Sequence, residues 1–142
     1  SVLGKTLTTA ESATGGHIAD RITNISGSSK VYLGGWNCYS NSFKEKELDI
    51  SPNTLERYTD VSEETVKELF DHALKQSNAD YAIAVVGYLG KSNLVERPHA
   101  YLCFGNNEKN ILKKIDLIYP RIKSKEAIAT TAMVGLYRDI LN

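Results

Sequence analysis

The stretch with the clearest chemical potential runs over residues 9–16, with the sequence Thr-Ala-Glu-Ser-Ala-Thr-Gly-Gly. It places hydroxyl groups and two glycines directly before a segment with helical apolar spacing. Backbone N–H groups and the positive dipole end of that helix start would favour a phosphate, or an acyl-transfer oxyanion, near Ser12. Gly15 and Gly16 would allow the backbone to approach a ligand closely. The alternative is structural: Ser12 or Thr14 caps the helix and the glycines form the turn.

A second candidate stretch covers residues 39–44, with the sequence Tyr-Ser-Asn-Ser-Phe-Lys, where an expected strand meets a short helix. A lysine near a serine can act as a general base once burial lowers its pKa. A tyrosine hydroxyl can relay the proton or orient the leaving group. Most lysines on short helices are solvated, so Lys44 taken alone also fits an ordinary surface residue.

Composition limits the class of protein that can use these residues. The 142 residues carry 17 Lys and Arg against 17 Asp and Glu, so the formal net charge is zero and no general positive field attracts nucleic acid. No apolar run approaches the roughly 20 residues that span a bilayer, and nothing near Ser1 resembles a signal peptide. Because the first residue is not Met, we expect that the start was trimmed or processed. We expect a cytoplasmic protein with a single domain over residues 1–142.

The sequence offers little support for metal chemistry. Cys38 and Cys103 are too few and too far apart for a metal cluster or a disulfide framework, and each is expected to be a small buried hydrophobe. The histidines at positions 17, 72 and 99 are scattered, and we expect surface or packing roles for them. We therefore predict no metal site and no cofactor.

The expected elements alternate along the chain in a way that indicates the fold class. We predict five strands, over residues 6–10, 31–39, 81–86, 100–104 and 111–118. We predict helices from residue 17 to about 24, over 41–48, over 62–77 and over 124–141, with a further helix start at 51–53. The resulting order, β-α-β-α-α-β-β-β-α, predicts an α/β fold, a three-layer α/β/α sandwich with a mixed, mainly parallel sheet of about five strands.

Four motifs occur in one order along nearly the whole chain. They are T-A-E-S-A-T-G-G over 9–16, G-S-S over 27–29, Y-S-N-x-x-K over 39–44 and P-R-x-x-x-K over 120–125. They resemble the motifs T-A-E-S-C-T-G-G, G-S-S, Y-S-N-x-x-K and G-D-R-x-x-x-R of the CinA C-terminal domain family, the nicotinamide-nucleotide amidohydrolases.

This resemblance implies roles for individual residues. Ser12 would be the nucleophile, Lys44 its general base and Tyr39 a proton relay or orienting hydroxyl, so we expect their side chains to converge within hydrogen-bond reach. The residues implied in substrate binding are Thr14, Gly15, Gly16, Ser28, Ser29, Asn41, Gly87 and Arg121, with Arg121 at the phosphate.

The resemblance also implies a reaction and its partners. The reaction is hydrolysis of the carboxamide of nicotinamide mononucleotide, or of a related nucleotide amide, to nicotinate mononucleotide and ammonia, without metal or cofactor. The implied partner is a small-molecule nucleotide substrate, with no nucleic acid and no membrane, and assembly into a homo-oligomer is a further expectation.

Departures from the family motifs leave a second interpretation open. Ala13 replaces the Cys of the signature, and the family's T-G-I-A-G-P appears over residues 86–91 as Val-Gly-Tyr-Leu-Gly-Lys. Val86 lacks the hydroxyl that would contact the substrate or support the nucleophile, a loss typically of about 1–3 kcal/mol. The alternative is therefore a catalytically weakened or inactive domain that binds a nucleotide or a protein partner, and a third, weaker alternative is a structural accessory domain.

Two further departures concern the shape of the predicted site. Tyr88, Leu89 and Lys91 are bulky or charged where the family has small residues and Pro, so we expect them to narrow the pocket or change the ligand. Pro120 replaces the Asp of G-D-R, which we expect to change how Arg121 is presented.

Overall fold

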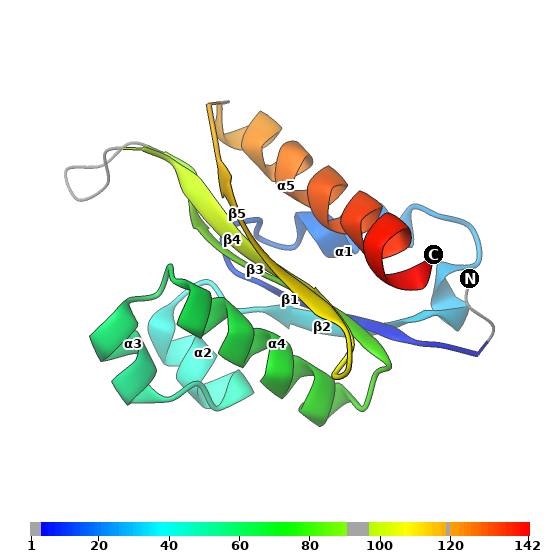
Figure 1. The fold of residues 1–142 in the computed structure, drawn as a ribbon, viewed down its shortest axis with the longest axis horizontal. Coiled ribbons are helices and arrows are strands. Elements are labelled where there is room, and N and C mark those ends of the chain that lie inside the picture. The colour runs from blue at the N-terminus through cyan, green and yellow to red at the C-terminus, as the bar shows by residue number, and fades with distance from the viewer. Residues whose placement is uncertain (1–3, 91–96, 119) are drawn as a thin grey trace.

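The computed structural model describes residues 4–90, 97–118 and 120–142. In these residues a five-stranded sheet lies between two layers of helices, as Figure 1 shows, which confirms the predicted three-layer α/β/α sandwich. The strands are β1 (Leu7–Glu11), β2 (Tyr32–Asn37), β3 (Tyr81–Tyr88), β4 (His99–Gly105) and β5 (Asn110–Asp116). The helices are α1 (His17–Thr23), α2 (Asn41–Leu48), α3 (Pro52–Tyr58), α4 (Glu63–Ser77) and α5 (Arg121–Gly135). A 3₁₀ turn, η1 (Ser28–Lys30), precedes β2, and a π-helical segment, η2 (Leu136–Leu141), continues α5.

The strand order in the sheet is β2-β1-β3-β4-β5. β1 pairs in parallel with both β2 and β3, whereas β4 pairs antiparallel with both β3 and β5. β5 therefore runs in the same direction as β3. Four of the five strands share one direction, so the mixed, mainly parallel sheet is confirmed.

Two details differ from the predicted order of elements. The chain between β2 and β3 forms three helices instead of two, because α3 develops from the helix start at 51–53, with Ser51 as N-cap and Pro52 in its first turn. The last helix begins at Arg121 rather than Ser124 and ends in the π-helical segment η2. The second difference concerns a helix boundary, the feature on which assignments vary most.

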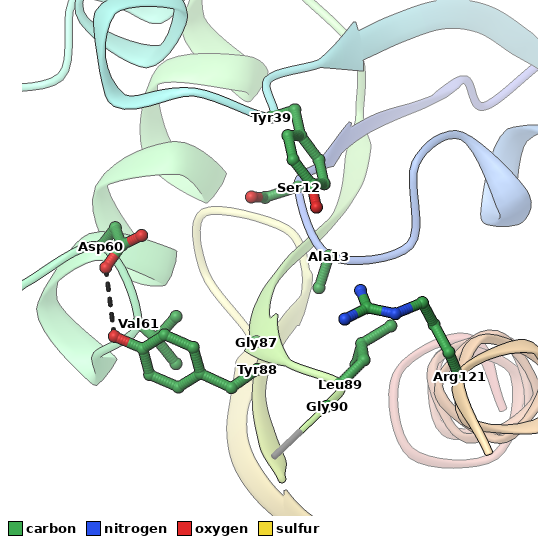
Figure 2. A pocket seen from close by; sticks show the side chains of 10 residues that line it. All are labelled: Ser12, Ala13, Tyr39, Asp60, Val61, Gly87, Tyr88, Leu89, Gly90 and Arg121. Carbon is green, nitrogen blue, oxygen red and sulfur yellow. Dashed lines mark hydrogen bonds between the residues drawn. The ribbon is translucent and has the colours of Figure 1, made fainter. Parts of the chain in front are cut away.

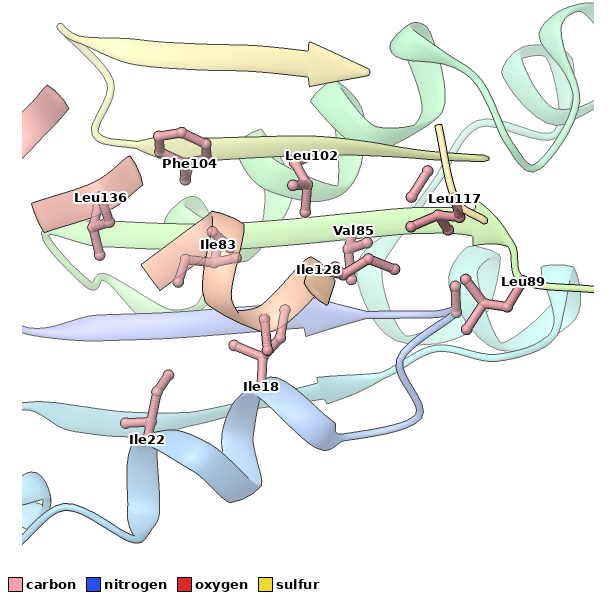
Figure 3. Close-up of a cluster of buried hydrophobic side chains, with 14 of the residues drawn as sticks. Ile18, Ile22, Ile83, Val85, Leu89, Leu102, Phe104, Leu117, Ile128 and Leu136 are labelled. Atoms are coloured by element: carbon pink, nitrogen blue, oxygen red, sulfur yellow. The ribbon is translucent and has the colours of Figure 1, made fainter. Parts of the chain in front are cut away.

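The sheet is buried on both faces because each face carries its own layer of helices. Along β3, Ile83 and Val85 pack toward α1 and α5, in the cluster drawn in Figure 3. Ala84 and Val86 point to the opposite face and pack against α4. This explains why the sequence of β3 is a continuous apolar run and does not alternate.

The connections of β1 and β3 leave a crevice at the carboxyl ends of these neighbouring strands. From β1 the chain passes through α1 to β2 at one edge of the sheet, and from β3 it turns toward β4 and the other edge. Diverging connections of this kind open the crevice in which α/β sheets bind ligands. Helices α4 and α5 begin at this end of the sheet and cover opposite faces (Figure 1).

Candidate active site

A cavity of about 260 Å³ lies in this crevice, and Figure 2 shows the side chains around it. Its lining comes from the β1–α1 turn, from Tyr39 between β2 and α2, from the loop between α3 and α4, from residues 87–90 and from the start of α5. Four of the predicted site residues contribute to it: Ser12, Tyr39, Gly87 and Arg121. The fold thus brings together residues from segments more than 100 positions apart, since Ser12 and Arg121 both line the cavity.

Ser12 lies immediately after β1 and lines the cavity. Its backbone N–H donates to the carbonyl oxygen of Val85 at 3.2 Å, so the β1–β3 ladder holds it in place. The residue is 8% exposed, and its Oγ makes no hydrogen bond to any residue that the structure describes. The N–H of Ala13 is also without a partner among the described residues. A mostly buried hydroxyl and an adjacent N–H donor are therefore available to a ligand.

The start of α1 is occupied by a carboxylate of the chain itself. Glu11 is 1% exposed, and its Oε1 accepts hydrogen bonds from the Ile18 N–H at 2.7 Å and from the Thr14 hydroxyl at 2.6 Å. Its Oε2 accepts from the Ala19 N–H at 3.0 Å. The carboxylate lies where the helix dipole favours negative charge. Glu11 therefore uses the N–H groups of Ile18 and Ala19, which are not available to the phosphate or oxyanion expected at this helix start.

The roles predicted for three residues of this turn change accordingly. The Thr14 hydroxyl is buried and bonded to Glu11, so it supports the fold and does not face the cavity. Gly15 and Gly16 have φ angles of 60° and 96°, a left-handed conformation that glycine adopts without steric cost. Neither is among the described residues that line the cavity. Their turn-forming role is confirmed, while the side-chain cap comes from Glu11 instead of Ser12 or Thr14.

Lys44 is 1% exposed, although it lies on the short helix α2. Its Nζ donates to the Tyr39 carbonyl oxygen at 3.4 Å and to Asn41 Oδ1 at 3.5 Å, both long for hydrogen bonds. Burial lowers the pKa of Lys44, and the charge of Asp60 and the Cys38 thiol oppose that shift less strongly. A lowered pKa favours the neutral amine that a general base requires.

The predicted convergence on Ser12 is not formed in this structure. Among the described residues, no hydrogen bond joins Ser12 Oγ to Lys44 Nζ or to the Tyr39 hydroxyl. Tyr39 is 68% exposed, and its side chain is drawn next to Ser12 in Figure 2, where both line the cavity. Asn41, predicted to bind substrate, contacts Lys44 instead and does not line the cavity.

Ser28 and Ser29 lie at the other end of β1 from Ser12. They belong to η1, and the chain next to η1 pairs with the start of β1 through a 2.9 Å hydrogen bond from the Leu7 N–H to the Val31 carbonyl oxygen. The described lining of the Ser12 cavity includes neither serine. Ser28 instead lines a second, largely apolar cavity of about 430 Å³ between η1, α1 and η2. The structure therefore does not support substrate binding by these two serines at the Ser12 cavity.

The residues that depart from the family motifs have distinct positions. Val86 is fully buried against α4 and is not part of the described lining. Tyr88 and Leu89 do line the cavity, and the Tyr88 hydroxyl donates to Asp60 Oδ1 at 3.3 Å. Burial raises the pKa of Tyr88, and the nearby Asp60 charge raises it further. Lys91 lies outside the described residues.

Pro120 and Arg121 form the start of α5 at the cavity. Pro120 is the N-cap and offers no side-chain hydrogen bond to the helix, unlike the Asp of the family motif, whose side chain could accept one. Arg121 is the first residue of α5, and its guanidinium lies against Gly90, where an added Cβ would be 2.9 Å from the Arg121 Nη2.

Sequence reasoning did not identify Asp60 as a site residue. It lies in the loop before Ser62, which caps α4 by accepting a hydrogen bond from the Thr65 N–H at 3.1 Å. The sequence predicts a helix over 62–77, so Asp60 lies just before an expected helix start, but that position by itself indicates no function. Its place in the cavity follows only from the packing of α4, because the start of α4 lies at the carboxyl end of β3.

The cysteines take no part in this site. Both are buried, as predicted. Burial raises the pKa of Cys38 to about 11 and that of Cys103 to about 12, so both thiols are protonated near neutral pH. In the described parts of the chain, His, Cys, Asp and Glu side chains form no group of three or more suited to a metal ion. The described helices also include none with the length and apolar content needed to cross a bilayer.

The fold and the site define an α/β/α sandwich with a serine hydroxyl at its first strand–helix junction. The model of the CinA C-terminal domain matches residues 2–140, so the chain belongs to the CinA C-terminal domain family. It is 36% identical over 141 residues to a CinA-like protein of Kosmotoga olearia, covering 97% of this chain and 34% of that protein. It is 38% identical over 136 residues to a CinA-like protein of Leptospira borgpetersenii, covering 93% of this chain and 32% of that protein. The chain thus spans about a third of the length of the curated relatives it matches.

Solved structures of similar proteins share the fold. The competence damage-inducible protein A (ComA) of Klebsiella pneumoniae superposes with a TM-score of 0.88 at 27% identity, covering 94% of this chain and 84% of that one. The competence/damage inducible protein CihA of Agrobacterium tumefaciens superposes with a TM-score of 0.85 at 32% identity, covering 95% of this chain and 85% of that one.

Proposed function

We propose that this domain is an amidohydrolase that deamidates nicotinamide mononucleotide, or a related nucleotide amide, to nicotinate mononucleotide and ammonia. The observation that carries the proposal is the Ser12 hydroxyl, which lines the cavity at the carboxyl end of β1 without a partner among the described residues. Lys44 is not among the lining residues, but its buried Nζ contacts the carbonyl oxygen of Tyr39, which lines the cavity, and its lowered pKa suits a general base. Family membership and the matching motifs supply the substrate class.

The proposed reaction has two stages. In the first, Ser12 Oγ attacks the carboxamide carbon while Lys44 accepts the hydroxyl proton, directly or through Tyr39. The Ala13 N–H, which follows the nucleophile, donates to the developing oxyanion. The C–N bond then breaks as Lys44 returns the proton to nitrogen, and ammonia leaves. In the second stage, water attacks the ester, which releases nicotinate mononucleotide and restores the Ser12 hydroxyl.

Two features of the site fit this sequence of steps. The contacts of Lys44 Nζ, at 3.4 and 3.5 Å, are long, so a shift toward Ser12 would lose little hydrogen bonding. The Arg121 guanidinium, which has no ion pair among the described residues, would hold the phosphate with two parallel hydrogen bonds.

Ammonia release from nicotinamide mononucleotide tests the proposal. We expect Ser12→Ala to lower kcat/KM by about 10³-fold or more, because the covalent route is lost. Ser51→Ala is the matched control, since the Ser51 side chain makes no capping hydrogen bond and lies outside the described lining of the cavity. Turnover by Ser12→Ala at the level of the unmodified protein would contradict the proposed nucleophile.

A second candidate function is a catalytically weakened or inactive domain that binds a nucleotide or a protein partner. The observation that favours it is the absence, among the described residues, of any hydrogen bond that connects the Ser12, Tyr39 and Lys44 side chains. If nicotinamide mononucleotide raises the melting temperature of the unmodified protein but releases no ammonia, this second function is supported.

A further inference from the structure

The cavity around Ser12 carries opposite charges on its two sides. Asp60 and Arg121 are the charged residues among the described residues that line it. Asp60 belongs to the loop before α4 and Arg121 is the first residue of α5, and these helices cover opposite faces of the sheet (Figure 1). Figure 2 accordingly shows Asp60 and Arg121 on either side of Ser12. A ligand bound at Ser12 would therefore meet a carboxylate on one side and a guanidinium on the other.

The Asp60 carboxylate is held in place without an ion pair, although its charge acts on the buried Lys44. Its Oδ1 accepts a hydrogen bond from the Tyr88 hydroxyl at 3.3 Å, and its Oδ2 has no hydrogen-bond partner among the described residues. No described Lys, Arg or His forms an ion pair with it. Tyr88 stays a neutral donor because burial raises its pKa. The negative charge of Asp60 thus remains available to a cationic group of a ligand.

We propose that Asp60 is a specificity residue that selects a ligand with a cationic ring, so that Asp60 and Arg121 together select a zwitterionic nucleotide. This inference rests on the proposed function and deepens it. In nicotinamide mononucleotide the pyridinium ring is positive and the phosphate is negative, and the ring carries the carboxamide. With the ring toward Asp60 and the phosphate toward Arg121, the two charges align the nucleotide across the cavity beside Ser12.

Reduction of the ligand gives a matched pair of probes. Reduced nicotinamide mononucleotide differs by one hydride, which removes the positive charge of the ring and leaves the carboxamide and the phosphate. We would measure binding of both forms by isothermal titration calorimetry in a Ser12→Ala protein, which stops turnover, with and without Asp60→Asn. We expect the Ser12→Ala protein to bind the oxidised form about 10-fold more tightly than the reduced form, because the oxidised ring forms one partly solvated charge pair with Asp60. Asp60→Asn should weaken the binding of the oxidised form only, so that the ratio of the two affinities comes near one.

Two further variants separate charge recognition from a general effect on folding. Asp60→Glu keeps the negative charge, so the preference for the oxidised form should remain. Asp71→Asn removes an exposed carboxylate on α4 that pairs with Lys67 outside the cavity, and it should leave the ratio unchanged. Thermal melting of each protein establishes that it is folded before binding is measured.

The outcomes distinguish this inference from the proposed function. The role of Asp60 is overturned if Asp60→Asn weakens the binding of both forms equally or leaves the ratio of their affinities unchanged. It is also overturned if neither form binds. Ammonia release by the unmodified protein is measured separately. An Asp60-dependent preference without ammonia release supports charge selection and refutes the amidase, whereas ammonia release without that preference refutes charge selection alone.

Discussion

The β1–α1 unit and the β2–α2 unit each bury one charged side chain, Glu11 at the end of β1 and Lys44 in α2, and the two side chains differ in how well they are hydrogen-bonded. Glu11 and Lys44 are both 1% exposed. The Glu11 carboxylate accepts three hydrogen bonds of 2.6 to 3.0 Å, two of them from the start of α1. The Lys44 amine has two contacts of 3.4 and 3.5 Å. A buried charge with strong partners stabilises the fold, whereas one with weak partners costs stability and shifts its pKa.

This contrast distinguishes a buried charge with a structural role from one with the properties of a catalytic group. The acidic residue next to the proposed nucleophile orients the turn and the first helix, and its carboxylate faces the helix start. The lysine 33 positions after Glu11 has the weak bonding that a proton-transfer group needs. Substitutions at the two residues should therefore affect different measured quantities.

The largest expected effect is on turnover and comes from Lys44. We expect Lys44→Met to lower ammonia release from nicotinamide mononucleotide by about 10²- to 10⁴-fold, the usual contribution of a general base. Methionine fills a similar volume without a buried amine, so the melting temperature should stay the same or rise. Lys46→Met, on the exposed side of the same helix, is the control. A Lys44→Met protein that retains full turnover would remove Lys44 from the mechanism.

The next effect is on stability and comes from Glu11. We expect Glu11→Gln to lower the free energy of unfolding by about 2–3 kcal/mol, because an amide cannot accept all three hydrogen bonds. Thr14→Val removes one of the three and should cost about 1 kcal/mol. Urea unfolding followed by circular dichroism measures both changes. Equal losses for the two variants would show that the carboxylate is not the centre of this network.

The smallest expected effect is a pH dependence of stability that belongs to Lys44. The pKa of Lys44 is lower in the folded protein than in the unfolded chain. Between these two pKa values the folded state has released the Lys44 proton, whereas the unfolded state still holds it. Stability therefore rises with pH across that interval. The free energy of unfolding of Lys44→Met should exceed that of the unmodified protein at neutral pH, and this difference should shrink toward about pH 10. Urea unfolding at several pH values measures it, and a constant difference would contradict a buried, titrating amine.

Much of the fold was predictable because its signals are local. The apolar run of β3, the stripe of α4 with Ser62 as its N-cap, and the glycine turn after Ser12 each depend on residues that are close in sequence. The position of Ser12 at a strand–helix junction followed from the same signals. Helix α3 was underestimated because it has seven residues and a single buried one, Leu55, so its apolar periodicity is weak.

The candidate site was predictable only in part because its members come from distant segments. Asp60 had no local signal of function, and its place opposite Arg121 depends on the starts of α4 and α5 meeting at one end of the sheet. Ser28 and Ser29 belong to a recognisable motif, yet the parallel pairing of β1 and β2 places them at the other end of β1.

The amino-acid sequence by itself determined the α/β class, the strand and helix segments, the family and the serine at the first junction, because periodicity and motifs are properties of neighbouring residues. Only the tertiary structure decided which charges are satisfied and which face the cavity. Glu11 is engaged by backbone N–H groups seven and eight residues later, and Asp60 and Arg121 face the same cavity across 61 positions of the chain. The bonding and exposure of a charged group depend on every element packed around it, and packing is established only when distant segments meet.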